Sequence, residues 1–257
     1  MYRIIITTTI HDPNSNMKDM ILNYGKKARE LCYRLFFIVS DTTSKEIIDL
    51  VKEYVDIVQI CHSKHIRDTY IDALKLGVSH AEENDKILYA DYDRLLHWVS
   101  TFPHELKHIL ESFPDVDFFH IGRSQRAFET HPETQRKTEI LANELGSVML
   151  GFSSTHDMLS ACYGFSKPLL EKILNVELKT ELGFYAKWAF SAYKMAKSYE
   201  YTQVEGQEWE TPDRFQNQIN TMGYEKWLEQ FQTAKEWKRR TELLADCLHE
   251  LYDLLKK

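Results

Sequence analysis

The chain has 257 residues, of which 43% are hydrophobic and 28% are charged, and its formal net charge is −7. This composition excludes a disordered chain, and the length fits one large domain or a domain with a small appendage. The acidic balance argues against non-specific nucleic-acid binding, which usually requires a basic patch, but a metal ion can still hold a phosphate on an acidic protein.

The first part of the chain alternates between short apolar runs and amphipathic segments. The apolar runs predict strands over residues 3–10, 34–40, 55–60 and 86–90. The segments between them predict helices over residues 16–32, after Ser44, and over residues 67–83. This order is typical of a parallel, doubly wound sheet, in which ligands bind at the carboxyl ends of the strands. We therefore expect Thr8, Asp41 and Asp91 along one edge of the sheet.

The second half of the chain is less regular. Its apolar runs predict strands over residues 116–121, 161–166 and 199–205, with helices from Pro168 and over residues 181–197. Residues 123–145 are polar, and we interpret them as a mobile segment over the site. The C-terminal tail is rich in helix-forming residues, and its apolar stripe consists of Leu244, Leu248, Leu251 and Leu255. The stripe predicts a helix docked on the domain, with a homodimer contact as the alternative.

The cysteines and the hydropathy pattern narrow the cellular context. Cys32, Cys61, Cys162 and Cys247 lie far apart without a C-x-x-C pair, which argues against a structural zinc site or a disulfide framework. No stretch is long enough to cross a membrane, and the N-terminal apolar run is too short for a signal peptide. We therefore expect a cytoplasmic protein with reduced thiols.

The segment around Asp91 carries the strongest chemical signal. The predicted strand ends at Ala90 and is followed by Asp91 and Asp93, two carboxylates at positions i and i+2. Hard divalent cations such as Mg²⁺ and Mn²⁺ prefer oxygen ligands and are commonly shared with substrate phosphates. We interpret the pair as a metal site; the alternative is a solvated turn, because Asp is common in turns.

Residues 1–100 resemble the nucleotide-binding half of the DxD-containing, family-2-like GT-A nucleotide-sugar glycosyltransferases. The resemblance is carried by three strand ends and by the segment before the third helix, and the residues it marks as donor-binding are Thr7, Thr8, Ile10, Asp41, Arg67, Asp91, Tyr92 and Asp93. It implies nucleoside contacts at the first two strand ends, diphosphate support from Arg67, and Mn²⁺ or Mg²⁺ held by Asp91 and Asp93.

The resemblance also implies a fold and a domain division. The expected fold is a GT-A-like, doubly wound, mainly parallel sheet flanked by helices, with a helical C-terminal tail. The catalytic domain is expected over residues 1–223, divided into a nucleotide-binding half (1–100) and an acceptor half (101–223). Residues 224–257 are expected as a helical extension packed on it.

A weaker resemblance continues in the acceptor half. Residues 163–167, which include Gly164, resemble the acceptor-side strand of the family, and Thr180-Glu181-Leu182 resembles the segment that supplies the catalytic base in inverting members. The implied base is Glu181, and inverting and retaining outcomes both stay open because Leu182 replaces the second acid. Alternatively, Thr180 caps a helix and Glu181 is a charge in its first turn.

Several other residues are candidates for the site. Arg123 follows a predicted strand and can bind a phosphate or an anionic acceptor, or it is a surface arginine. Trp188 and Trp209 are assigned to the acceptor side, and the alternative for Trp209 is a buried tryptophan in a solvated loop. His156 or Glu205 is a candidate third metal ligand, although a lone histidine is more often structural.

These features predict a metal-dependent glycosyltransferase that transfers a sugar from a nucleotide-sugar donor to a sugar or another hydroxyl acceptor. A nucleotidyltransferase is an alternative, but no glycine-rich phosphate loop follows the first strand. A non-catalytic nucleotide-sugar-binding protein of the same fold also stays open, because a fold alone does not guarantee activity. A glycoside hydrolase is disfavoured, since its two acids flank the scissile bond.

Overall fold

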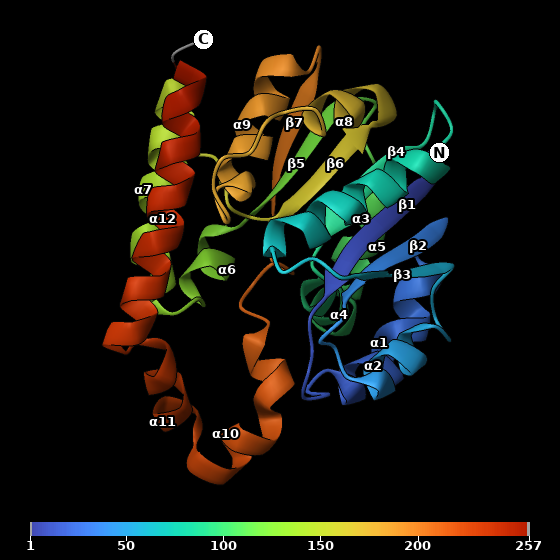
Figure 1. The fold of residues 1–257 in the computed structure, drawn as a ribbon, viewed down its shortest axis with the longest axis vertical. Coiled ribbons are helices and arrows are strands. Elements are labelled where there is room, and N and C mark those ends of the chain that lie inside the picture. The colour runs from blue at the N-terminus through green and yellow to red at the C-terminus, as the bar shows by residue number, and fades with distance from the viewer. Residues whose placement is uncertain (1, 256–257) are drawn as a thin grey trace.

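A seven-stranded mixed sheet forms the centre of the protein in a computed structural model that describes residues 2–255, the side chain of Leu255 excepted (Figure 1). The strands are β1 (Ile4–Ile10), β2 (Arg34–Ser40), β3 (Ile57–Cys61), β4 (Lys86–Ala90), β5 (Phe118–Arg123), β6 (Cys162–Ser166) and β7 (Tyr199–Val204). Their order is β3-β2-β1-β4-β6-β5-β7; β6 is antiparallel to β4 and β5, and the other pairs are parallel. The predicted α/β fold class, with a mainly parallel sheet flanked by helices, is confirmed.

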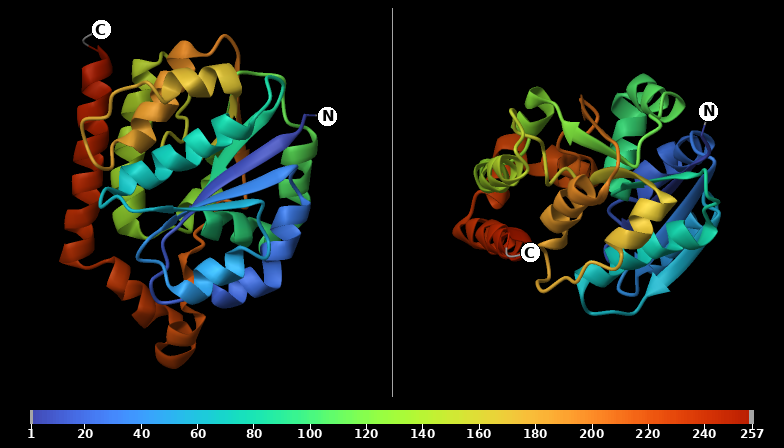
Figure 2. Two further views of the ribbon diagram at one scale, coloured as in Figure 1. Left: turned by 45° about the vertical axis from the view of Figure 1, so that its right-hand side comes forward. Right: turned by 90° about the horizontal axis from the view of Figure 1, so that it is seen from above.

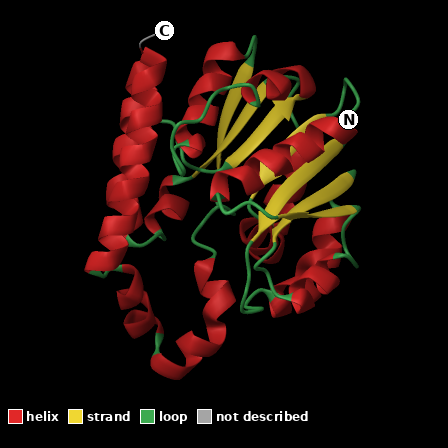
Figure 3. Ribbon diagram, in the orientation of Figure 1, coloured by secondary structure: helices red, strands yellow, loops and turns green. Residues whose placement is uncertain are grey.

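Helices cover both faces of this sheet (Figure 3). One face carries α1 (Lys18–Glu30), α2 (Lys45–Val51), α4 (Tyr92–Thr101) and α5 (Pro103–Glu111), and the other carries α3 (Ile66–His80), α8 (Lys167–Ile173) and α9 (Phe184–Met195). Successive side chains of a strand point to opposite faces. Accordingly, Ile4 and Ile6 of β1 are buried in the first core cluster and Ile5 in the second. A strand that is apolar on both faces is what a doubly covered sheet requires.

The C-terminal part of the chain forms a helical layer beside the sheet. After β7 it consists of η1 (Thr211–Phe215), α10 (Gln216–Met222), α11 (Tyr224–Leu228), η2 (Glu229–Phe231) and α12 (Ala234–Leu255). The layer also includes two helices from the middle of the chain, α6 (Gln125–Glu129) and α7 (Glu133–Met149). Helix α12 runs beside α7 and also contacts α9 (Figures 1 and 2). Leu251 is buried and Leu244 packs against the same small core cluster, as a docked helix requires. The side chain of Leu255, the last residue of the predicted stripe, lies outside the described residues.

The structure shifts some predicted boundaries and corrects one interpretation. The strand predicted over residues 116–121 is β5, which begins and ends two residues later. Residues 123–145, which we expected as a mobile segment, form the end of β5, α6 and most of α7, and α7 packs against α12. Apolar residues of α7 such as Ala142 contribute to the cluster with α12, so this segment is part of the folded body.

Across residues 2–255, no helix combines the length and hydropathy that a membrane crossing requires.

Candidate active site

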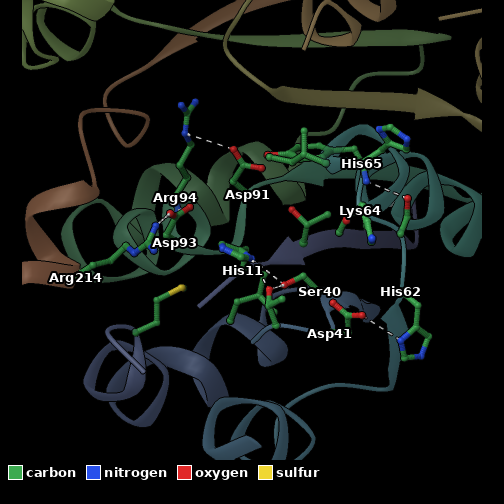
Figure 4. Close-up of a pocket in the computed structure, with 18 of the residues that line it drawn as sticks. His11, Ser40, Asp41, His62, Lys64, His65, Asp91, Asp93, Arg94 and Arg214 are labelled. Atoms are coloured by element: carbon green, nitrogen blue, oxygen red, sulfur yellow. Dashed lines mark hydrogen bonds and ion pairs between the residues drawn. The ribbon is translucent and has the colours of Figure 1, made fainter. Parts of the chain in front are cut away.

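A cavity of about 880 Å³ opens at the carboxyl ends of β1, β2 and β4 (Figure 4). This edge is where a parallel, doubly wound sheet places its ligands. Of the residues predicted to bind the donor, Ile10, Asp41, Asp91 and Asp93 line the cavity. Strand ends that are separated by up to eighty residues in the sequence therefore meet at one site.

Asp91 and Asp93 lie at the start of α4, directly after the buried strand β4. Asp91 occupies the N-cap position, and Asp93 lies in the first turn. Tyr89 donates its hydroxyl hydrogen to Asp91 Oδ1 over 2.6 Å. Burial raises the pKa of Asp91 to about 6, against the attraction of Arg94 and with a further contribution from Asp93. A carboxylate whose ionised form is disfavoured by burial gains from a bound cation.

Two arginines and a third carboxylate complete this side of the cavity. Arg214 Nη1 lies 3.0 Å from Asp93 Oδ2, and Arg94 Nε lies 3.9 Å from Asp91 Oδ2 and 3.6 Å from Glu210 Oε2. Glu210 is buried, and its Oε2 accepts no hydrogen bond from the described residues. Burial raises the pKa of Glu210, although Arg94 opposes this. Carboxylates and guanidinium groups together can hold both a metal ion and a phosphate.

The side of the cavity near β1 and β2 is lined by hydroxyl and imidazole groups. His11 Nδ1 lies 2.8 Å from Ser40 Oγ, and His62 Nδ1 lies 3.3 Å from Asp41 Oδ2 (Figure 4). Asp41 is exposed to the cavity. Lys64 also lines it and has no ion-pair partner within residues 2–255. These groups can hydrogen-bond the hydroxyls of a ribose and offer one ammonium group to a phosphate.

Three residues predicted at the donor site point elsewhere. Thr7 and Thr8 are fully buried inside β1, before the end of the strand that lines the cavity. Their hydroxyls have no hydrogen-bond partner within the described chain. Tyr92 is buried in the core, where its ring meets Phe37 edge-on with the centroids 4.3 Å apart. Successive helical residues point about 100° apart, so the middle residue of the D-x-D motif faces the core while Asp93 faces the cavity.

Arg67 also lies off the cavity wall. Its Nη1 donates to the backbone carbonyl oxygens of Thr180 at 3.1 Å and Leu178 at 3.5 Å. It thereby ties the start of α3 to the segment before α9. The diphosphate role that the resemblance implies for Arg67 stays a prediction; the lysine and arginines that line the cavity are Lys64, Arg94, Arg214 and Arg239.

Glu181, the implied base, lies beside the cavity rather than on its wall. Its Oε2 is 3.0 Å from His65 Nδ1, and His65 does line the cavity. The segment around Glu181 is fixed from α12, because Glu250 accepts the backbone N–H groups of Lys179 and Thr180. The C-terminal helix therefore determines where this carboxylate lies.

The acceptor-side candidates are distributed over several places. Arg123 is fully buried, with Nε 2.6 Å from Asp157 Oδ2 and Nη2 2.7 Å from Glu139 Oε2. Gly164 lies within β6, where an added Cβ would be 2.3 Å from the Phe113 ring. Neither residue lines the cavity, and the buried ion pairs of Arg123 are those of a structural group.

The two tryptophans and the two candidate third metal ligands also separate. Trp188 is buried in the core between the sheet and α9, whereas Trp209 lines a smaller pocket beside the cavity. The ring of His156 stacks on Tyr201, with the centroids 4.0 Å apart. Glu205 forms an ion pair with Arg126. Neither His156 nor Glu205 lines the cavity.

The sequence reasoning missed several cavity residues. Arg94, Lys64, His11, Glu210, Arg214 and Arg239 all line it. The first three follow strand ends or precede α3, so their positions next to the predicted motifs are a usable signal. Glu210, Arg214 and Arg239 come from the loop after β7 and from α12, and no local pattern brings them to the D-x-D motif.

The carboxylates of the cavity can be matched to the ligands that a divalent cation needs. Within residues 2–255, no group of three or more His, Cys, Asp or Glu side chains is arranged to hold a metal ion. Mg²⁺ is usually bound by one or two carboxylates together with substrate phosphates and water. Asp91 and Asp93 provide such a pair, and Glu210 Oε2, which accepts no hydrogen bond from the described residues, lies 3.6 Å from Arg94 Nε on the same wall. The residues fit a cation that binds together with a phosphate ligand.

No protein-family model matches this sequence, and no curated protein matches it. Solved structures give 48 matching chains. One is a glucosyl-3-phosphoglycerate synthase from Mycobacterium tuberculosis in complex with Mn²⁺, uridine diphosphate and glucosyl-3-phosphoglycerate, with 10% identity and a TM-score of 0.49 over 79% of this chain and 70% of that chain. Another is S. aureus TarS, with 14% identity and a TM-score of 0.45 over 98% of this chain and 72% of that chain.

A third match is the 4-diphosphocytidyl-2C-methyl-D-erythritol synthase from Anaerococcus prevotii, with 10% identity and a TM-score of 0.49 over 86% of this chain and 98% of that chain. The three matches have TM-scores of 0.45–0.49 and identities of 10–14%. The function proposed below depends on the side chains of this chain.

Proposed function

We propose that this protein is a metal-dependent glycosyltransferase that uses a nucleotide-sugar donor. The observation that carries the proposal is the cavity at the carboxyl edge of the sheet, where the carboxylates of Asp91 and Asp93 lie beside the guanidinium groups of Arg94 and Arg214. This combination suits a diphosphate bound together with a divalent cation.

The donor would lie across the cavity. Its nucleoside would contact the side formed by Ile10, His11 and Asp41, where hydroxyl, imidazole and carboxylate groups are available to a ribose. Its diphosphate would lie toward Asp91 and Asp93, within reach of Lys64 and Arg214. Lys64 has no ion-pair partner among the described residues, so the bound phosphate would not have to displace a carboxylate from it.

Asp91 and Asp93 would hold Mn²⁺ or Mg²⁺, which supplies Lewis-acid stabilisation of the departing nucleoside diphosphate. The work of the chain's own residues is to orient these carboxylates. Tyr89 orients Asp91 through its hydroxyl, and the backbone N–H of Arg94 orients Asp93 over 2.9 Å. Arg94 and Arg214 would then contact phosphate oxygens as the negative charge on them grows.

Two carboxylates are available to remove the proton from the acceptor hydroxyl. Glu181 follows from the family resemblance and is linked to the cavity by His65. Glu210 lines the cavity, and burial raises its pKa, which makes its carboxylate a stronger base. Kinetic measurements on Glu181→Gln and Glu210→Gln, each with a Tm equal to that of the wild type, identify which carboxylate is the base. Loss of the base lowers kcat more than it raises the donor KM.

A thermal-shift screen of nucleoside diphosphates and nucleotide-sugars, with and without Mn²⁺, tests the function. A ligand that binds the folded state raises Tm by mass action. We expect one base to give a shift that needs Mn²⁺ and is lost in Asp93→Asn, and the matching nucleotide-sugar to be turned over. A shift without turnover on any hydroxyl acceptor would favour the non-catalytic binding protein, and the absence of any shift would reject the donor site.

A further inference from the structure

A smaller pocket of about 170 Å³ lies beside the cavity. The two share five lining residues: Ile66, Asp91, Arg94, Glu210 and Arg239. Because the shared residues include one acid of the D-x-D motif, a molecule in the pocket would lie next to the end of the donor that reacts. The pocket is therefore placed for the acceptor, and its lining indicates the acceptor's chemistry.

Two consecutive arginines of α12 line this pocket, Arg239 and Arg240. The side chain of Arg240 is 14% exposed and is fixed by acceptors on two helices. Its Nη2 donates to Gln135 Oε1 at 2.7 Å, its Nε to Glu236 Oε1 at 3.2 Å, and its Nη1 to Glu139 Oε1 at 3.5 Å. A guanidinium has five N–H donors, so Arg240 keeps donors for a ligand while its orientation is set.

Arg240 lies close to two carboxylates and to a second guanidinium group. Burial lowers the pKa of Arg240, and the neighbouring Arg239 adds to this, although Glu139 opposes it. Arg239 is itself half-exposed and turned to Glu236 on the same helix. Because Glu236 contacts both guanidinium groups, an anion would bind the N–H donors that remain on them, and a planar guanidinium binds carboxylate or phosphate oxygens in pairs.

The remaining walls are largely apolar, and they limit the size of the acceptor. Their apolar residues are Leu159, Ala161, Leu182, Tyr185, Trp209 and Leu243, and their polar residues are Gln135, Glu139 and Thr211. A long oligosaccharide would need polar groups along such walls, because buried hydroxyls without partners are costly. A short carbon skeleton with one anionic group suits both the walls and the arginines.

We propose that this pocket binds the acceptor, and that the acceptor is a small hydroxylated molecule whose phosphate or carboxylate is held by Arg239 and Arg240. The inference rests on the proposed function, since it places the acceptor beside the donor cavity. It assigns a substrate-binding role to the C-terminal helix, which the sequence had indicated only as a packing element or a dimer contact.

The test is isothermal titration of four probes in two matched pairs: glycerol 3-phosphate against glycerol, and lactate against 1,2-propanediol. We expect an anionic member to bind at least tenfold more tightly than its neutral partner. Arg239→Gln and Arg240→Gln should each remove most of that difference. Lys238→Gln is the matched control, because it makes the same charge change on an exposed side chain of the same helix. The phosphate and carboxylate pairs show which anion is preferred.

Further arms separate this inference from the proposed function. If glycerol 3-phosphate bound equally well to the wild type and both arginine variants but was lost in Lys64→Gln, its phosphate would occupy the donor cavity, and the inference would be overturned. Equal binding of charged and neutral probes would also overturn it. Binding of nucleoside diphosphate with Mn²⁺ reports on the donor site separately and should be unchanged in Arg240→Gln, because Arg240 lines the smaller pocket and not the cavity. The side chain of Arg239 is 55% exposed, so misfolding is a poor explanation for lost probe binding in Arg239→Gln.

Discussion

The cavity has two walls that are held in place by different interactions. The strand-end wall consists of the residues that follow β1, β2, β3 and β4, and its position is set by the backbone hydrogen bonds of the parallel sheet. The C-terminal wall consists of the loop over residues 205–215 and of α12, and it is held by ionic side-chain contacts in addition to the apolar cluster under α12. Backbone ladders do not titrate in the physiological range, whereas carboxylate, histidine and arginine contacts respond to pH and salt.

This difference indicates where conditions and mutations should act. The strand-end wall would keep its geometry when single side chains change, and substitutions there should alter chemistry rather than stability. The C-terminal wall would move when its ionic contacts are removed, so substitutions far from the reacting groups should alter both activity and stability. The four predictions below test this contrast, from the largest expected effect to the smallest.

The largest effect is expected for Glu250→Ala on α12. Glu250 is fully buried, is ion-paired with Lys187, and accepts the backbone N–H groups of Lys179 and Thr180 at 2.6 and 2.7 Å. Removing one partner of a buried ion pair leaves an uncompensated charge and typically costs about 3–5 kcal/mol. We expect that loss in the free energy of unfolding, measured by urea denaturation. Glu242→Ala, an exposed site on the same helix, is the control, and equal losses for the two would show that α12 is not anchored through Glu250.

The next effect is expected on activity, for Asp93→Asn on the strand-end wall. Loss of a group that stabilises developing charge typically lowers kcat by about 100-fold or more. Because Asp93 is partly exposed and lies in the first turn of α4, we expect Tm to change by little. Asp49→Asn, on an exposed helix face, is the control for the charge change. Full activity of Asp93→Asn would remove the metal site from the proposal.

How far the sequence predicts this site follows the same division between the walls. Local patterns are sufficient for the strand-end wall, since an apolar run followed by Asp91 or Asp41 identifies both the strand and its carboxyl end. Local patterns do not predict which way each side chain of the motif points: the resemblance includes Tyr92 with the D-x-D acids, but Tyr92 faces the core. They also fail for Glu210, Arg214 and Arg239, because these side chains reach the cavity only through the packing of α12 and the loop after β7.

The third prediction concerns pH and the loop over residues 205–215. His97 is buried between two acids of that loop, with Nδ1 2.6 Å from Asp213 Oδ2 and Nε2 3.1 Å from Glu208 Oε1. Burial disfavours the charged imidazole, but the contacts with Asp213 and Glu208 outweigh it, so the pKa of His97 is raised. A raised pKa means that this stabilisation is complete below the unfolded pKa and is lost as pH rises through the folded pKa.

His97→Gln should therefore be about 1–3 kcal/mol less stable than the wild type at low pH, the range for hydrogen bonds to charged groups. The difference in the free energy of unfolding between the wild type and His97→Gln should become smaller as the pH increases through the range in which His97 loses its proton. Unfolding free energies of both proteins between about pH 5.5 and 8.5 measure it. A gap that widened with pH would mean that His97 is neutral in the folded protein and holds the loop in another way.

The smallest effect is expected for Arg126→Gln at the outer edge of the same loop. Arg126 forms ion pairs with Glu205 and Glu208, but half of its side chain is exposed, and Glu208 also contacts His97. Exposed ion pairs are worth about 0–1 kcal/mol and are screened by salt. We expect a loss within that range at low salt and almost none at high salt, with the donor KM changed less than in His97→Gln. A larger loss in Arg126→Gln than in His97→Gln would place the anchor of the C-terminal wall on its exposed rim rather than in the buried histidine contact.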